Sequence, residues 1–134
     1  MKNADIVYPT VQELIEFNVI VLDSIKIKKA DQNKVLSYQK IKNIIEGVKI
    51  SDGDIYDKAT YLMRQTVSQH AFASGNRRTA FIVSKFFLQS NNEAFNIPDN
   101  PDYARIMIGI PDNYRDDEIK NWIKNGNIRE FKRH

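Results

Sequence analysis

The chain has no cysteine among its 134 residues, and its only histidines are His70 and His134. Without thiols it cannot form disulfides, use a cysteine nucleophile or bind zinc or iron–sulfur clusters through cysteine. Two histidines leave little for a zinc site of another kind. These counts exclude thiol chemistry and restrict catalysis to other side chains.

Long apolar runs are missing as well. The first ten residues contain no signal-peptide core, and no stretch approaches the length of a membrane span. We therefore expect a cytoplasmic protein with no membrane partner.

The excess of positive charge is also small, because the chain has 20 basic and 17 acidic residues and a net charge of +3. This charge permits nucleic acid as a partner without indicating it.

The bulk composition is that of an ordinary globular protein. Hydrophobic residues make up 42% and charged residues 28% of the chain, and the length suits one domain over residues 1–134. Thr10 and Glu13 form a capping box before an apolar stripe, the usual start of a helix. Apolar periodicity predicts further helices, so that we expect six in all, at residues 11–26, 31–47, 55–70, 76–89, 101–110 and 116–125.

One short segment does not follow the helical pattern. Residues 49–54 alternate weakly and carry turn-forming side chains, which is typical of an extended flap or hairpin. Gly47 stands before this segment, where it can end the second helix. The sequence therefore predicts an all-α bundle of about six helices with a short extended flap before the third.

The chemically distinctive segment runs from His70 to Ala80 and reads HAFASGNRRTA. A helix that begins at Asn76 offers free backbone N–H groups and the positive end of its dipole, which together bind anions. Gly75 leaves room for a ligand to approach the backbone. Arg77 and Arg78 can hold phosphate oxygens, and because they point about 100° apart on a helix, one can bind the ligand while the other faces elsewhere.

His70 comes directly before this phosphate-binding loop. An imidazole changes its protonation near neutral pH and can act as a general base in the same space. A base next to a phosphate site is what transfer from a nucleoside triphosphate to a hydroxyl group requires, besides a metal. The segment therefore predicts an enzyme that acts on a nucleotide.

The segment resembles the signature of the Fic/Doc family, His-x-Phe-x-Asp/Glu-Gly/Ala-Asn-x-Arg. His70 stands at the position of the general base, Phe72 at that of a core anchor, Gly75 and Asn76 at the phosphate loop, and Arg78 at the phosphate-binding arginine. The resemblance implies an all-α, single-domain Fic/Doc bundle that uses ATP as its co-substrate.

Ser74 departs from the signature. The family has Asp or Glu at this position, where the carboxylate holds the Mg²⁺ that bridges the phosphates, and a neutral hydroxyl is a poor sole ligand for a hard dication. Ser74 can bind through a metal-bound water, or Asp52 or Asp54 on the predicted flap can supply charge, or the site is inactive. The sequence leaves these alternatives open, and Mg²⁺ binding with them.

Two positions favour the Doc branch of the family. AMP-transferring Fic proteins usually have glycine at the position of Arg77 and a second arginine at that of Phe81, whereas Doc has lysine and an apolar residue. Doc is a toxin that phosphorylates a hydroxyl group on a translation factor. The resemblance thus implies transfer of a phosphoryl group from a nucleoside triphosphate to a Ser or Thr hydroxyl of a target protein, such as a translation factor.

The resemblance also implies how two protein partners are bound. In the family, a flap before the motif helix aligns a segment of the target by strand pairing. This assigns substrate docking to Lys49, Ile50, Ser51, Asp52, Gly53 and Asp54. Some relatives restrain themselves with a helix of the pattern Ser/Thr-x-x-x-Glu-Gly/Asn, which this sequence lacks, so we expect a separate antitoxin protein.

Three other interpretations remain. The first is AMP transfer by the Fic mechanism. The second is a catalytically silent Fic/Doc fold that binds a nucleotide or a partner protein, because Ser74 replaces the metal-binding acid. The third is a small DNA-binding protein, which is disfavoured because the helix after the motif is too apolar to serve as a recognition helix.

Overall fold

The structure is a computed structural model that describes residues 5–25 and 34–131. Within these ranges it contains six helices and no sheet, which confirms the all-α fold predicted from the sequence. The helices are α1 (Val11–Ile25), α2 (Tyr38–Ile50), α3 (Ile55–Ser68), α4 (Asn76–Ser90), α5 (Asp102–Gly109) and α6 (Asp116–Asn125).

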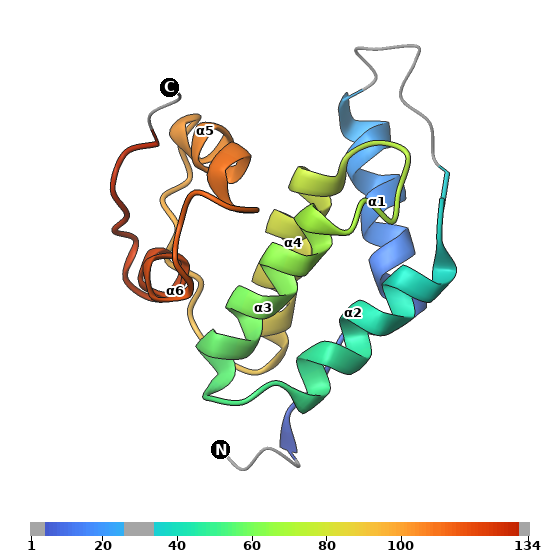
Figure 1. The fold of residues 1–134 in the computed structure, drawn as a ribbon, viewed down its shortest axis with the longest axis horizontal. Coiled ribbons are helices and arrows are strands. Elements are labelled where there is room, and N and C mark those ends of the chain that lie inside the picture. Colours follow the sequence, from blue (N-terminus) through green and yellow to red (C-terminus); the bar gives the residue numbers. More distant parts are fainter. Residues whose placement is uncertain (1–4, 26–33, 132–134) are drawn as a thin grey trace.

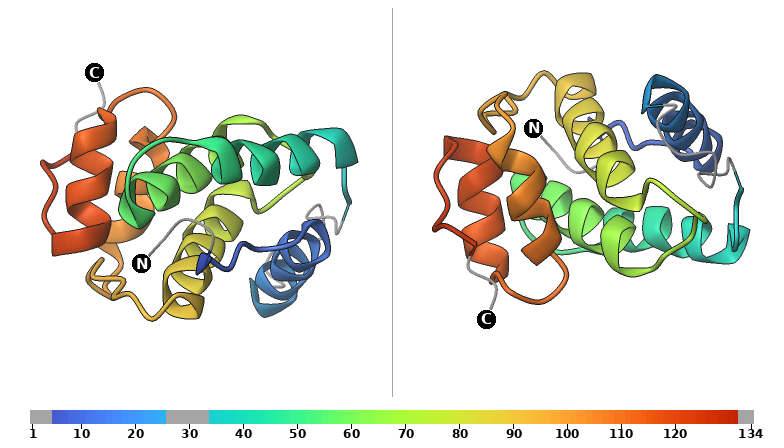
Figure 2. Two further views of the ribbon diagram at one scale, coloured as in Figure 1. Left: turned by 90° about the horizontal axis from the view of Figure 1, so that it is seen from below. Right: turned by 90° about the horizontal axis from the view of Figure 1, so that it is seen from above.

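Helices α3 and α4 lie at the centre of the fold. Figure 1 shows α1 and α2 on one side of this pair and α5 and α6 on the other. In the views of Figure 2, α2 lies along α3 and α1 along α4, so that two helix pairs are stacked. One hydrophobic cluster contains residues of every helix, among them Leu14, Ile44, Leu62, Val83, Met107 and Trp122.

Helix α1 begins as its capping box predicts. The Thr10 hydroxyl accepts from the Glu13 N–H at 3.0 Å, and the Glu13 carboxylate accepts from the Thr10 N–H at 2.9 Å. The predicted bounds of α4 and α6 are also confirmed, and Gly126 ends α6 with a φ of 80°. At these three helices the local sequence pattern therefore gave correct ends.

Helix α2 differs from the prediction at both ends. Its predicted start at Asp31 lies outside the described residues, but residues 34–37 are not helical, and the helix begins after Ser37, whose hydroxyl accepts from the Lys40 N–H. Gly47 does not end the helix. A Cβ at Gly47 would lie 2.2 Å from the hydroxyl oxygen of Tyr61, so this glycine allows α2 to pack closely on α3.

The predicted flap at residues 49–54 is not a strand. Lys49 and Ile50 belong to the last turn of α2, and Ser51, Asp52, Gly53 and Asp54 form the connection to α3. Asp54 caps α3 by accepting from the Tyr56 N–H at 2.9 Å. The weak alternation that suggested a flap reflects a helix end followed directly by a helix cap.

Lys58 fastens this connection from within the fold. Its side chain is 1% exposed, and its ammonium group donates to the carbonyls of Ser51 at 2.7 Å, Val48 at 3.0 Å and Lys49 at 3.2 Å. These carbonyls at the end of α2 have no partner within the helix, and a cation satisfies them and complements the helix dipole. The 49–54 segment is therefore tied to the helices and offers no open strand edge.

The same segment lies far from the motif. It precedes α3, whereas His70 follows α3, and 14 helical residues at about 1.5 Å each separate the two by roughly 20 Å. Figure 1 shows the two connections at opposite ends of α3. Asp52 and Asp54 therefore cannot supply charge at Ser74.

The helices in the described ranges also include none that is long and apolar enough to cross a membrane.

Replacing Lys58 with Met should lower the free energy of unfolding by roughly 2–3 kcal/mol, because carbonyls at the end of α2 lose their donor while the methylene packing is kept. Urea denaturation monitored by circular dichroism measures the change. Lys42→Met, at an exposed position of the same helix, is the matched control. Equal midpoints for the two variants would show that the Lys58 hydrogen bonds do not stabilise this connection.

Candidate active site

The site begins where α3 ends. The helix was predicted to run to His70, but it ends at Ser68, and the apolar stripe ends with buried Val67. His70 is exposed and has a φ of 50°. This left-handed conformation costs a residue with a Cβ about 1–2 kcal/mol. It turns the chain away from the helix axis and leaves the imidazole free to face the following loop.

An amide side chain closes that loop. Asn76 donates from Nδ2 to the Phe72 carbonyl at 2.9 Å and accepts at Oδ1 from the Phe72 N–H at 3.2 Å. Phe72 itself is 1% exposed, in agreement with its predicted role as a core anchor. The Asn76 side chain thus closes the loop, and the second N–H of its amide and its backbone N–H remain for a ligand in the pocket that this residue lines.

Helix α1 holds the loop from the other side. Asn18 is 2% exposed, and its Nδ2 donates to the Ser74 carbonyl at 2.8 Å and to the Thr79 hydroxyl at 3.1 Å. Gly75 has a φ of 78°, and a Cβ there would lie 3.1 Å from Leu22. Glycine is therefore favoured by the backbone conformation and by the close approach of α1.

Residues 34–37 form the third support of the loop. Val35 and Phe72 make an isolated antiparallel bridge. The Leu36 N–H donates to the Ala71 carbonyl at 2.7 Å, and the Ala73 N–H donates to the Lys34 carbonyl at 2.9 Å. Within the described residues this is the only β-type pairing, and it lies beside the motif rather than at residues 49–54.

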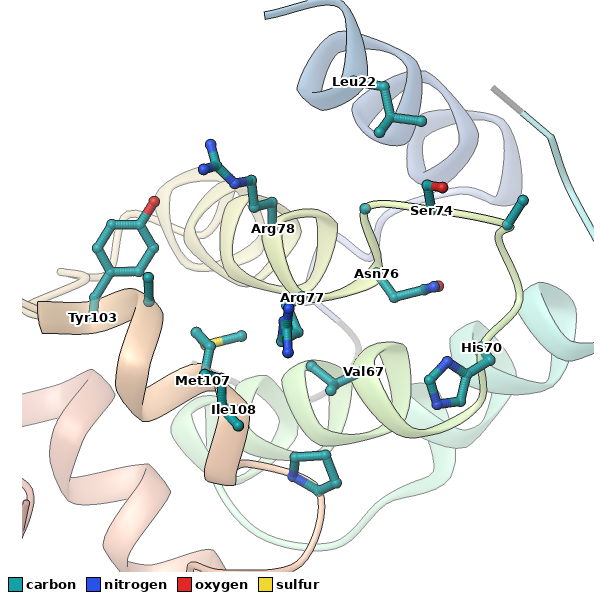
Figure 3. Close-up of a pocket in the computed structure, with 14 residues that line it drawn as sticks. Leu22, Val67, His70, Ser74, Asn76, Arg77, Arg78, Tyr103, Met107 and Ile108 are labelled. Atoms are coloured by element: carbon teal, nitrogen blue, oxygen red, sulfur yellow. The ribbon is translucent and has the colours of Figure 1, made fainter. Parts of the chain in front are cut away.

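These elements enclose a pocket of about 750 Å³. Figure 3 shows His70 and the loop on one side of it and α5 on the other. The motif contributes polar and cationic groups, whereas α5, α1 and α3 contribute a largely apolar wall. The lining residues are Leu22, Val67, His70, Ala73, Ser74, Gly75, Asn76, Arg77, Arg78, Tyr103, Ala104, Met107, Ile108 and Pro111.

The residues predicted to bind an anion line this pocket. No side chain caps the start of α4, so the N–H groups of its first turn are available to a ligand. Arg77 and Arg78 are both exposed and have no ion-pair partner among the described residues. In Figure 3, Arg77 lies in the middle of the pocket near Val67, while the side chain of Arg78, which also lines the pocket, points away from that of Arg77. The two guanidinium groups point apart, as predicted.

The pocket does not fit Mg²⁺. Its lining contains two guanidinium groups and no carboxylate, whereas Mg²⁺ is usually held by carboxylates in a near-octahedral set of oxygens. The Ser74 carbonyl and Asn76 Oδ1 already accept hydrogen bonds. Across the described part of the chain, no cluster of three His, Cys, Asp or Glu side chains could hold a metal ion.

The structure thus brings together in one pocket all the residues predicted from the motif, and it separates them from the predicted flap. They are His70, Ser74, Gly75, Asn76, Arg77 and Arg78. Sequence reasoning missed the residues of α1 and α5, and the segment 34–37. One signal for Asn18 was available, because it is the single polar residue in the stripe Leu14, Asn18, Val21, Leu22. The wall of α5 carried no such signal, since its apolar residues read as ordinary core.

Replacing Asn18 with Ala should loosen the motif loop, because the Ser74 carbonyl and the Thr79 hydroxyl lose a buried donor. We expect faster amide hydrogen exchange in residues 71–75, measured by mass spectrometry, and a loss of roughly 1–2 kcal/mol in unfolding free energy. Gln12→Ala, at an exposed position of α1, serves as the control. Unchanged protection of the loop in the Asn18 variant would remove Asn18 from this role.

Comparison with known proteins agrees with the site. No curated protein matches the chain significantly. The Fic/DOC family model matches residues 8–88, which include α1 to α3, the motif loop and most of α4. The match leaves the branch within the family unresolved. Because it covers more than half of the sequence, the chain belongs to the Fic/DOC family, whose members are commonly transferases that typically use ATP.

Proposed function

We propose that this protein transfers the γ-phosphoryl group of a nucleoside triphosphate to a Ser or Thr hydroxyl of a target protein. One observation carries the proposal: a base, two arginines and the start of a helix line one side of a single pocket, and an apolar wall lines the other. The charged side suits the phosphates of a ligand, and the apolar wall suits a nucleoside. A nucleotide is the ligand class that uses both.

In this mechanism His70 acts at the target hydroxyl. The imidazole takes the proton as the hydroxyl oxygen attacks the γ-phosphorus, the bond from that phosphorus to the bridging oxygen breaks, and the nucleoside diphosphate leaves. Arg77, Arg78 and the first N–H groups of α4 stabilise the charge on the phosphate oxygens. Asn18 is a positioning residue, because it holds the loop from α1 and does not line the pocket, whereas Asn76 closes the loop and also lines the pocket, where it can contact the phosphates.

Two features favour phosphoryl transfer over AMP transfer. The side chain of Arg77 lies across the middle of the pocket, where AMP-transferring Fic proteins usually have a glycine. Phe81, at the position of their second arginine, stacks on Tyr103 with ring centroids 4.3 Å apart. The side that would need a second guanidinium is filled by an aromatic contact between α4 and α5.

A second candidate is a silent fold that binds a nucleotide or a partner without transfer. The observation that favours it is the lining of the pocket, which has Ser74 in place of the family's acid and no other carboxylate. Transfer assays and binding assays separate the two candidates. A silent fold binds its ligand but transfers no group.

We also propose that the target docks beside residues 34–37 rather than at residues 49–54. The backbone groups of Val35 face away from Phe72 in this pairing pattern, and they form no hydrogen bond with any described residue. Leu36 beside it is 57% exposed. An extended target segment can add to such an edge next to His70.

If the protein is a toxin, as its resemblance to Doc implies, a separate antitoxin protein restrains the enzyme.

Incubation with γ-labelled or α-labelled ATP and a cell lysate tests the reaction. We expect label on protein from the γ position only, because the proposed cleavage leaves the α-phosphate in the released diphosphate. Label from the α position alone would replace this proposal with AMP transfer. Label from neither position, together with nucleotide binding, would favour the silent fold.

His70→Asn is the control for that experiment. Asparagine adopts the left-handed conformation more readily than most residues, so the thermal midpoint should stay close to that of the wild type. Transfer should fall to background because no base remains. Transfer that survives in a folded His70→Asn protein would exclude His70 as the base.

Leu36→Glu and Ile50→Glu test the docking edge as a matched pair, because the two apolar side chains are 57% and 82% exposed and lie in the two candidate segments. We expect Leu36→Glu to slow protein labelling at least several-fold, while ATP binding and stability stay unchanged. Ile50→Glu should leave labelling unchanged. The reverse pattern would restore the 49–54 segment as the docking site.

A further inference from the structure

We propose that the pocket binds phosphate anions without a divalent cation, and that Arg77 supplies the charge that a metal ion supplies elsewhere in the family. The inference rests on the proposed nucleotide site and concerns how that site compensates the charge of the phosphates. Three observations carry it, and they concern the oxygen ligands, the positive charges and the acidic residues of the chain.

The loop offers Mg²⁺ no carboxylate, and two of its neutral oxygens already accept hydrogen bonds. Asn18 donates to the Ser74 carbonyl at 2.8 Å, and Asn76 Oδ1 accepts from the Phe72 N–H. The Ser74 hydroxyl is the polar group that remains at the position of the family's acid. A single neutral hydroxyl does not hold a strongly hydrated dication, which usually requires carboxylate ligands.

The positive charges of the pocket point to an anion as the direct ligand. Arg77 crosses the middle of the pocket (Figure 3), Arg78 lines its edge, and the uncapped start of α4 adds the positive end of a helix dipole. A guanidinium group can bind two phosphate oxygens at once. A dication at Ser74 would meet repulsion from all three, with no carboxylate to offset it.

The pocket lining contains no acidic residue, and three acidic residues elsewhere pair with cations. Asp54 and Asp57 pair with Lys120 at 3.2 and 3.0 Å at the far end of α3. Asp116 pairs with Arg64 at 2.8 Å on the face between α3 and α6. Asp31 is the one acidic residue of the chain outside the described ranges, so the experiment includes it.

Isothermal titration calorimetry with ATP tests the inference, once in excess EDTA and once in excess Mg²⁺. We expect ATP to bind in EDTA with an affinity equal to or higher than in Mg²⁺, because the metal neutralises part of the charge that the arginines recognise. Inorganic pyrophosphate should bind in EDTA as well. Binding of ATP only in Mg²⁺, or about 10-fold tighter there, would overturn the inference.

Variants show whether Arg77 replaces the metal. Arg77→Gln should weaken ATP binding in EDTA by about 10-fold or more, since a charged two-point contact is lost. Arg105→Gln makes the same chemical change at an exposed position of α5 that does not line the pocket, and it should have no effect. Equal affinities for the two variants would also contradict the inference.

Restoring the acid should reverse the metal dependence. In Ser74→Asp we expect weaker binding in EDTA and stronger binding in Mg²⁺ than in the wild type. If the wild type requires Mg²⁺ and Asp31→Asn abolishes that requirement, the inference fails and Asp31 is the missing ligand. Thermal midpoints of all variants, measured in EDTA, exclude loss of folding as the cause.

The outcomes also separate this inference from the proposed function. ATP binding in EDTA without transfer to protein would overturn the proposed reaction and leave the metal-free site intact. Transfer that requires Mg²⁺ would support the reaction and overturn the metal-free site. Absence of binding to ATP and pyrophosphate under both conditions would overturn both.

Discussion

The paired hydrogen bonds between the Asn76 side chain and the backbone of Phe72 are the contact on which the site depends. They close the loop between α3 and α4, so that the phosphate-binding start of α4 lies beside His70. Asn18 adds a second attachment from α1. A loop with several exposed polar groups would otherwise sample many conformations, and each contact removes part of that freedom. The turn is thereby held in its binding geometry before any ligand arrives.

The strained backbone of His70 is consistent with this arrangement. A left-handed residue with a Cβ persists where its surroundings determine the conformation, and such residues cluster at functional sites. Here α3 fixes the chain before His70, and buried Ala71 and Phe72 fix it after. Glycine would suit the conformation better, as it does at Gly75 and Gly126. A histidine at this point is therefore explained by chemistry better than by the turn itself.

Most of the helices could be predicted because their signals are local. The capping box at Thr10 depends on a few neighbouring residues and appears as predicted, and α6 has its predicted bounds, with Gly126 directly after its last residue. Gly47 misled because its role is in packing against Tyr61, a contact that the local sequence cannot reveal. The 49–54 segment misled for the same reason, since Lys58 binds its carbonyls from the next helix.

The candidate site could be predicted only for the residues that lie in one continuous segment of the sequence. The motif from His70 to Arg78 located the base, the arginines and the helix start, but long-range contacts add the rest. Asn18 reaches the loop across 56 residues, and residues 34–37 pair with it through a single bridge. Neither contact leaves a periodic pattern. The bridge is also too short for strand signals, which need several alternating residues.

The division of the pocket bears on what determines its specificity. The family match ends at Leu88, whereas Tyr103, Met107 and Ile108 of α5 lie beyond it and form much of the apolar wall. The matched part contributes the groups that we propose to act on phosphate, which every nucleotide shares. The wall contacts whatever is attached to the phosphates, and the stacking of Phe81 on Tyr103 fixes its position. In the proposed function, the choice among nucleotides therefore depends on α5, and the charge compensation depends on the segment from Ser74 to Arg78.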